Sequence, residues 1–236
     1  MEVGLEAGRP RIAILLYDGL TALDFIAPHQ AWAMFADVFL VSRDGAPITT
    51  DSAIVIHATH CFETCPEQLD VFFVPGGMAT FDLMLDVETI EFVRAQGEQA
   101  RYVTSVCNGA MVLGAAGLLD GYRAATHWAT RHMLGLTGDV EVVPDRVVID
   151  RNRLTGGGVT AGLDFGLTVL ARLQGEQVAK NAQLILEYNP APPFNAGHPS
   201  VADEETIAQV KAFLSQMDDH GLAQAREVKR QRALTA

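Results

Sequence analysis

Cys107 stands where a strand pattern gives way to a helix pattern. The β-type run of residues 102–106 precedes it, and Asn108, Gly109 and a series of small residues follow. A side chain at such a strand-to-helix turn is presented on a sharp, often strained bend. The free N–H groups and the positive dipole end of the following helix favour a thiolate over a thiol. We therefore expect Cys107 to be a catalytic nucleophile; the alternative is an inert, buried cysteine.

Two glycine turns should lie beside this cysteine. Gly76 and Gly77 follow the apolar run of residues 70–75, and Gly156 begins a triple-glycine turn after another candidate strand. If the sheet is parallel, these turns share one edge with the cysteine, which is the edge where ligands bind. Their bare backbone N–H groups could stabilise negative charge on a reacting atom. We expect Gly76, Gly77 and Asn108 to contact the substrate or a developing oxyanion.

Asp24 is the acidic residue expected near the cysteine. Pro28 suits the first turn of a helix, so a helix starting near Ala27 would leave Asp24 in the preceding loop. A carboxyl beside a thiolate should have a raised pKa, because two like charges close together are unfavourable. It could then hold a proton, hydrogen-bond the sulfur and transfer the proton as general acid or base. The alternative is that Asp24 merely caps the helix.

His127 closes a short candidate strand, residues 123–127, and could support the site from behind. The alternative is a structural histidine bonded to the backbone. Cys61 and Cys65 have C-x₃-C spacing with histidines nearby, but no second pair of ligands follows at zinc spacing, so we expect no metal. Three irregularly spaced cysteines also do not make a disulfide framework.

The elements that must position these residues alternate between strand and helix patterns. Residues 11–17 are a continuous apolar run, typical of a strand buried on both faces of a parallel sheet. Further strand patterns cover residues 37–42, 70–75, 102–106, 140–143 and 147–149, a hairpin arm with residues 54–56 as its core lies within 47–57, and helix patterns cover 79–99, 160–173 and 175–187. The alternation predicts one α/β sandwich. We expect a single domain over residues 11–236 after an extension of residues 1–10, with a C-terminal helix over about 203–232.

The composition limits the classes of partner. Of 236 residues, 49% are hydrophobic and 19% charged, which is typical of a globular protein. The net charge of −12 makes nucleic acid an unexpected partner, and the basic residues near the C-terminus suit a solvated helix end. No apolar run is long enough to cross a bilayer, and the N-terminus has no signal-peptide pattern. We expect a soluble cytoplasmic protein with reduced thiols.

The sequence resembles the ThiJ/PfpI superfamily and, within it, the isocyanide (isonitrile) hydratases. The resemblance covers about residues 11–200, and its motifs are LDFIAP with Asp24, DVFFVPGG, YVTSVCNGAMVLGAAGLLDG, ATHWAT, LTGGGVTAGLDF and LEYNPAPPFNAG. The PGG turn and the cysteine turn mark only the superfamily. The THW, TGGGVTAG and PAPPFNAG motifs are narrower and favour the hydratase branch.

The resemblance implies a flavodoxin-like three-layer sandwich with a mostly parallel sheet, a homodimer, and neither a metal nor an organic cofactor. It implies that Cys107 is the nucleophile and Asp24 its acidic partner. The implied reaction is that of a hydro-lyase: water adds to an isocyanide, R–N≡C, to give an N-substituted formamide through a thioimidate. The sequence departs from the hydratase pattern at Asn108, where we expect threonine. Asparagine could change the hydrogen bonding around the sulfur or the shape of the pocket.

Two alternatives remain open. Other enzymes of the superfamily carry out glyoxalase-type or amidase-type reactions, but those branches usually place glutamate where Asp24 stands, and a protease-like branch places histidine after the cysteine. A non-catalytic redox or ligand sensor is the second alternative. Sensor halves of transcription regulators carry an added helix-turn-helix domain, and the residues after 203 are too few for one.

Overall fold

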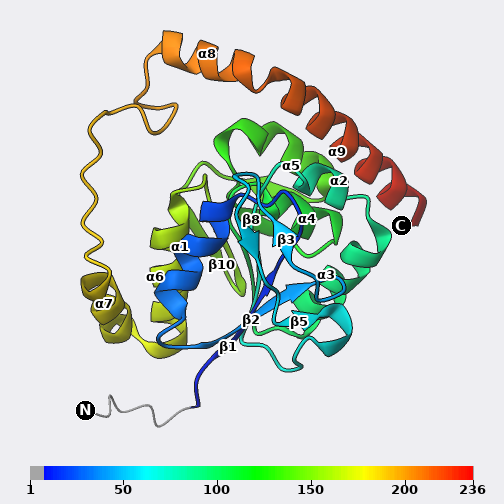
Figure 1. The fold of residues 1–236 in the computed structure, drawn as a ribbon. Coiled ribbons are helices and arrows are strands. Elements are labelled where there is room, and N and C mark those ends of the chain that lie inside the picture. The colour runs from blue at the N-terminus through cyan, green and yellow to red at the C-terminus, as the bar shows by residue number, and fades with distance from the viewer. Residues whose placement is uncertain (1–7, 236) are drawn as a thin grey trace.

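A seven-stranded sheet runs through the centre of residues 8–235, the part of the chain that the computed structural model describes (Figure 1). The strand order is β10-β11-β7-β6-β1-β2-β5. The strands are β1 (Arg11–Leu15), β2 (Asp37–Ser42), β5 (His60–Cys61), β6 (Val71–Val74), β7 (Tyr102–Ser105), β10 (Val147–Asp150) and β11 (Arg153–Gly156). Neighbours pair in parallel except β10 and β11, which are antiparallel. The mostly parallel sheet that the sequence predicts is confirmed.

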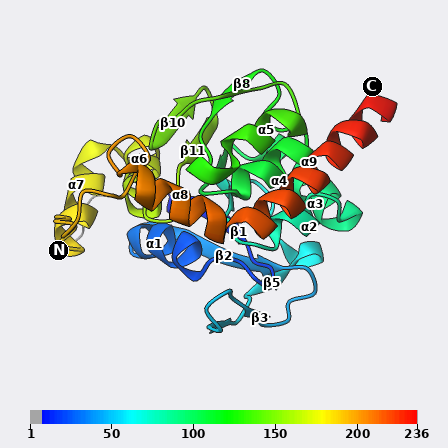
Figure 2. The same cartoon turned by 90° about the horizontal axis from the view of Figure 1, so that it is seen from above.

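Helices cover both faces of the sheet and complete the predicted three layers (Figures 1 and 2). One layer consists of α1 (Ala22–Trp32), α6 (Ala161–Gln174) and α7 (Glu176–Ile185). The other consists of α2 (Thr80–Leu83), α3 (Val87–Gln99), α4 (Gly109–Ala115), α5 (Arg131–Thr137) and α9 (Ser215–Thr235). The single helix pattern over residues 79–99 is thus two helices. The strands of β1 and β6 are buried almost throughout, because helices shield both faces.

The contact between α1 and α6 fixes the helix that carries Asp24. Trp32 of α1 lies edge-on to Phe165 of α6, with ring centroids 5.9 Å apart, and its indole N–H donates to the Gly166 carbonyl at 2.8 Å. The two helices approach closely because Gly166 has no side chain: a Cβ there would lie 3.1 Å from the Pro28 backbone. Buried aromatic contacts of this kind contribute strongly to stability, so α1 has little freedom to shift.

The predicted hairpin within residues 47–57 forms from β3 (Ile48–Thr49) and β4 (Val55–Ile56), which pair antiparallel. Its predicted core is wrong in part, because Ile54 and Val55 are 45% and 57% exposed and only Ile56 is buried. The hairpin lies outside the main sheet and packs against the loop before α1, where the Asp51 N–H donates to the Leu20 carbonyl. One face of it therefore stays in solvent.

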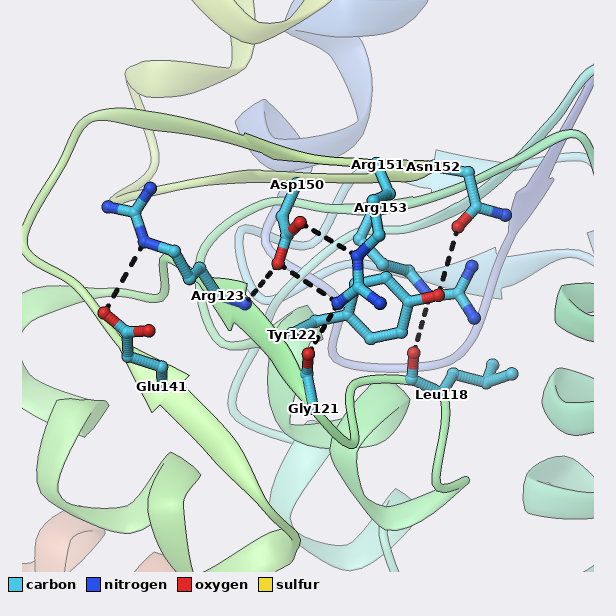
Figure 3. A network of polar contacts seen from close by, with 9 residues as sticks. All are labelled: Leu118, Gly121, Tyr122, Arg123, Glu141, Asp150, Arg151, Asn152 and Arg153. Carbon is cyan, nitrogen blue, oxygen red and sulfur yellow. Dashed lines mark hydrogen bonds and ion pairs between the residues drawn. The ribbon is translucent and has the colours of Figure 1, made fainter.

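A small parallel ribbon, β8 (Tyr122–Ala124) with β9 (Val140–Val142), is tied to the main sheet by a polar network (Figure 3). The Arg123 N–H donates to the Asp150 carboxylate at 2.8 Å, and the Arg151 guanidinium lies 3.6 Å from the centre of the Tyr122 ring. The chain that leaves β8 leads directly to Thr126. This network therefore helps to position one wall of the candidate site.

The C-terminal segment differs from the single helix predicted over about 203–232. It forms two helices, α8 (Glu204–Phe213) and α9, with a break at Leu214. The helix α8 projects away from the body while α9 packs on α5, so Phe213 at the end of α8 is 86% exposed (Figure 1). Residues 186–203, whose first part is the proline-rich stretch 186–199, form the irregular arm before α8 (Figure 1).

Two further expectations bear on the chain ends and on membranes. Most of the predicted N-terminal extension, residues 1–7, lies outside the described residues, as does residue 236. In the basic C-terminal region, Arg232 pairs with Asp120 and Arg230 with Glu227. Within residues 8–235, no helix is both long and apolar enough to span a bilayer.

Candidate active site

Cys107 lies on the predicted turn between β7 and α4. Its φ of 53° is in the left-handed region, which costs a non-glycine residue about 1–3 kcal/mol. The backbone is held on both sides: the Cys107 N–H donates to the Gly157 carbonyl at 2.6 Å, and its carbonyl accepts from the Thr126 hydroxyl at 3.0 Å. The triple-glycine turn therefore does lie beside the cysteine, as the parallel sheet predicts. The strained conformation aims the sulfur away from the strand, toward Asp24.

Three side chains from separate segments converge on Gly76. A Cβ placed on this glycine would lie 2.5 Å from Asn108 Oδ1, 2.6 Å from Asp24 Oδ2 and 2.7 Å from Cys107 Cβ. No real side chain fits at such distances, so only glycine allows the three groups to meet here. The residues that the sequence singles out in the segments that follow β1, β6 and β7 thus come together at one point.

Asp24 lies inside α1 rather than in the loop before it. The helix begins at Ala22 and not near Ala27, so this expectation is wrong. The Asp51 carboxylate, from the β3–β4 hairpin, accepts the Ala22 N–H at 3.2 Å and supplies a cap from outside the helix. Pro28, taken as a first-turn residue, sits instead within the helix, which forgoes one backbone hydrogen bond there.

The Asp24 carboxyl is fully buried and does not cap its own helix. Oδ2 accepts the Gly76 N–H at 3.0 Å, whereas Oδ1 has no N–H or O–H partner among the described residues. Burial raises the pKa of Asp24 to about 7, although the nearby Cys107 thiol and the Gly76 N–H favour the carboxylate. The raised pKa is as expected, but its main cause is burial and not the repulsion of a thiolate. Near neutral pH this group can both take and give a proton.

The Cys107 thiol is 6% exposed, and this burial raises its pKa well above the usual value. The negative charge of Asp24 raises it further, and the Asn108 backbone N–H lowers it less than burial raises it. Burial therefore opposes the thiolate that the helix N-terminus favours. A proton held on the sulfur must leave as the sulfur attacks. Asp24 is the neighbouring group able to accept it.

Both glycine N–H groups expected to bind a substrate have partners within the protein. The Gly76 N–H is bonded to Asp24, and the Gly77 N–H donates to Asn108 Oδ1 at 2.8 Å. The Asn108 amide in turn donates to the Gly77 carbonyl at 3.0 Å. An anion-binding role for Gly76, Gly77 and Asn108 stays a prediction. The Asn108 backbone N–H is the donor that faces the sulfur.

His127 does not close a strand, since β8 ends at Ala124. It begins a short 3₁₀ turn instead, and its Nδ1 accepts the Ala129 N–H at 3.3 Å. The ring borders the triple-glycine turn, where a Cβ on Gly158 would lie 3.1 Å from it. Burial and the charge of Arg131 lower the pKa of His127. A neutral imidazole that supports the backbone matches the structural alternative.

Tyr17 and Thr126 belong to the site and were not singled out from the sequence. The Tyr17 hydroxyl donates to the Pro75 carbonyl at 2.7 Å, which fixes the residue before Gly76. Burial, followed by the charges of Asp24 and Cys107, raises the pKa of Tyr17 well above its usual value. The available signal was position: Tyr17 ends the apolar run of the first strand, at the edge where sites form in parallel sheets.

The Cys61–Cys65 segment lies apart from these residues, on η1 (Phe62–Thr64) and its flanks. The Cys61 sulfur is 3.3 Å from the Thr64 hydroxyl, and His60 bonds to its neighbour Thr59. Within residues 8–235, no three His, Cys, Asp or Glu side chains come close enough to share a metal ion.

Comparison with known proteins places this geometry in a family. Residues 10–172 match the model of the DJ-1/PfpI family. The chain belongs to the DJ-1/PfpI family. The isonitrile hydratase of Pseudomonas putida is 46% identical over 203 residues, which cover 85% of this chain and 88% of that protein. The crystal structure of a ThiJ/PfpI family protein from Pseudomonas syringae, 41% identical, covers 95% of this chain and 94% of its own, with a TM-score of 0.91. The transcriptional regulator GbdR of Pseudomonas aeruginosa is 30% identical over 140 residues, 59% of this chain but only 38% of the regulator.

These similarities confirm the family and fold that the motifs predict. The match to the hydratase spans nearly the full length of that protein, whereas the match to the regulator is confined to part of it. The residues that match the family model, 10–172, include the seven strands of the main sheet, the cysteine turn and the two flanking glycine turns.

Proposed function

We propose that this protein is a hydro-lyase that hydrates isocyanides to N-substituted formamides, with Cys107 as nucleophile and Asp24 as general acid and base. The observation that carries the proposal is the convergence of a buried thiol and a carboxyl of pKa about 7 around Gly76. The 46% identity to an isonitrile hydratase supports the choice of substrate class. No metal or organic cofactor is required by the chemistry below.

The first half of the reaction forms a carbon–sulfur bond. The terminal carbon of R–N≡C approaches the Cys107 sulfur, and the thiol proton passes to the Asp24 carboxylate as the sulfur attacks. Asp24 then returns this proton to the same carbon. The product is the thioimidate Cys107–S–CH=N–R, in which no atom has been lost and Asp24 is again ionised. Covalent catalysis of this kind replaces one difficult addition with two easier ones.

The second half adds water and releases the enzyme. Asp24 removes a proton from a water molecule as the water oxygen attacks the thioimidate carbon, and Asp24 passes this proton to the nitrogen, which gives Cys107–S–CH(OH)–NH–R. The carbon–sulfur bond then breaks as the hydroxyl proton passes by way of Asp24 to the sulfur, which restores the Cys107 thiol and the ionised Asp24. The released product is R–NH–CHO, so one water is consumed per isocyanide and no oxidant is needed.

The surroundings of the pair suit an uncharged substrate. Asp24 is fully buried and Cys107 is 6% exposed. A buried site favours a neutral, weakly hydrated molecule over a charged one, because a charged molecule loses its hydration on entry. An isocyanide has this character.

The redox-sensor alternative fits the site less well. Peroxide-sensing cysteines are accessible and have a low pKa, whereas Cys107 is 6% exposed and its pKa is raised by burial. A glyoxalase-type or amidase-type reaction remains the alternative among enzymes. It uses the same thiol, so only turnover distinguishes it.

The test is direct turnover of a small alkyl isocyanide by the purified chain. Loss of the N≡C stretching band is followed by infrared spectroscopy, and the formamide is identified by mass spectrometry. We expect Cys107→Ala to abolish formamide production, while the control Cys65→Ala, remote from Asp24, retains it. Absence of formamide with the wild type, or undiminished production by Cys107→Ala, would reject the proposal. A mass adduct on the Cys107 peptide during turnover would support the thioimidate.

The homodimer and the cytoplasmic location stay proposals. The outer face of α1 exposes Leu23, Ile26 and, just beyond the helix, Met34, which form an apolar strip that a second copy could cover. Sedimentation velocity at micromolar concentration tests this directly. A single species at the mass of one chain, 25.4 kDa, would contradict the dimer.

A further inference from the structure

The Asn108 side chain bonds through both its oxygen and its nitrogen to one backbone residue, Gly77. It is 5% exposed, its Oδ1 accepts the Gly77 N–H at 2.8 Å, and its Nδ2 donates to the Gly77 carbonyl at 3.0 Å. The same Oδ1 packs on Gly76, 2.5 Å from where a Cβ would stand. A buried amide that is paired in this way is not a free group directed at a substrate.

The Gly76–Gly77 turn is held from several directions. The Thr21 N–H, at the start of α1, donates to the Gly76 carbonyl at 2.9 Å. The Thr80 hydroxyl, at the start of α2, donates to the Gly77 carbonyl at 2.6 Å. Asn108 adds a clamp from the residue that follows the nucleophile, and so it couples this turn to Cys107 itself.

The orientation of this turn matters because the Gly76 N–H is the donor to Asp24 Oδ2. Resting on the proposed hydratase function, we propose that the Asn108 side chain is a positioning residue that locks the Gly76–Gly77 turn to the cysteine turn, so that the Gly76 N–H stays on Asp24 while protons pass between Asp24 and Cys107. Threonine, expected here from the hydratase pattern, has one hydroxyl and cannot bond the N–H and the carbonyl of Gly77 in the same way. In this protein, asparagine therefore connects the Gly76–Gly77 turn to the cysteine turn more rigidly than threonine would.

A rigid link has a measurable consequence for proton transfer. The Gly76 N–H favours the ionised form of Asp24. If the turn loosens, that bond weakens and the carboxyl holds its proton to higher pH. The acid limb of the pH–rate profile should therefore move upward in Asn108→Ala and less in Asn108→Thr. We expect kcat to fall about 10- to 100-fold in Asn108→Ala with KM little changed, as misplaced catalytic groups do.

The experiment measures two pH profiles on wild type, Asn108→Ala and Asn108→Thr. The first is kcat/KM for a small alkyl isocyanide. The second is the rate of Cys107 alkylation by iodoacetamide, read by peptide mass spectrometry, which needs no turnover. Asn181→Ala, an exposed position in α7, serves as the control. In both reactions the thiol gives its proton to ionised Asp24 as the sulfur attacks, so we expect both profiles to move upward in Asn108→Ala and to remain in place in Asn181→Ala.

The outcomes separate this inference from the proposed function. A wild type that does not hydrate isocyanides, together with a shifted alkylation profile in Asn108→Ala, would reject the function and support the positioning role. A raised KM with both profiles unshifted would assign Asn108 to substrate binding and overturn the inference. A lower melting temperature with unshifted profiles and unchanged kcat would also overturn it, because the role would be structural only.

Discussion

Gly76→Ala tests the central geometric observation, because the added methyl group would stand among all three converging side chains. It would lie 2.5 Å from Asn108 Oδ1, 2.6 Å from Asp24 Oδ2 and 2.7 Å from Cys107 Cβ. The Gly76 backbone is outside the left-handed region, so an alanine is not strained there by its conformation. Crowding is then the cause of any effect.

The size of the effect follows from the shortness of these contacts. Asp24 is held by a helix that packs on α6, and the Cys107 backbone is bonded on both sides, so neither group can retreat freely. Overpacking of this kind costs about 1–3 kcal/mol of folding free energy. A displacement near 1 Å of groups that must exchange a proton lowers the rate by about 100-fold. We expect both losses together.

The assay pairs kcat for an alkyl isocyanide with the free energy of unfolding in urea. Gly135→Ala is the matched control, since a Cβ there meets nothing within 4 Å and the residue is exposed in α5. The control should be about 0.5–1 kcal/mol more stable and equally active, because alanine is the better helix former. Unchanged kcat in Gly76→Ala would refute the reasoning, whether or not stability falls. It would show that the placement of Asp24, Cys107 and Asn108 does not depend on the absence of a side chain at Gly76.

Three further predictions follow from the buried pair. The kcat/KM of the wild type should fall below about pH 7, because a protonated Asp24 cannot take the thiol proton; an acid limb near pH 4 would contradict this. Asp24→Asn should be inactive and should lack a pH dependence of stability that the wild type has. Since the folded pKa of about 7 lies above the unfolded value, the wild type should lose up to about 4 kcal/mol of unfolding free energy as pH rises from about 4 to about 7, and then level off. Equal free energies of unfolding in urea at pH 5 and pH 8 would count against the buried carboxyl. Thr126→Val leaves the Cys107 carbonyl without its hydroxyl donor and should cost about 1–3 kcal/mol. The control is Thr49→Val, at an exposed position of β3; equal stability of the two variants would show that the bond is dispensable.

The local features of the site could be read from the sequence because they depend on neighbouring residues. The strand before Cys107, the small residues after it and the PGG turn all lie within short segments whose patterns are distinctive. The approach of Asp24 to Cys107 could also be predicted, since parallel strands bring their carboxyl ends to one edge. The same motifs identified Asp24 and Cys107 as site residues and indicated the family.

Other features depended on contacts between distant segments. The start of α1 was misplaced because its cap, Asp51, comes from a hairpin nearly thirty residues later in the chain. The sequence predicts one C-terminal helix, because the helical spacing of its apolar residues continues across Leu214. The structure has two helices, and α9 is the one that packs on α5. Periodicity reports which residues are apolar but not which surface covers them.

The pKa of Cys107 also depends on both local sequence and distant contacts. From the sequence alone, a cysteine before a helix favours a thiolate, because the helix N-terminus is a local effect. In the folded chain, burial beneath several segments raises the pKa of Cys107 and brings Asp24 to about 7, and this effect is larger. The sequence by itself determined which residues form the site, since turn chemistry and strand order are written in short motifs. Only the tertiary structure decided how burial shifts the pKa values of Cys107 and Asp24 and which glycine N–H groups have partners, because desolvation and hydrogen bonding depend on everything packed around Gly76.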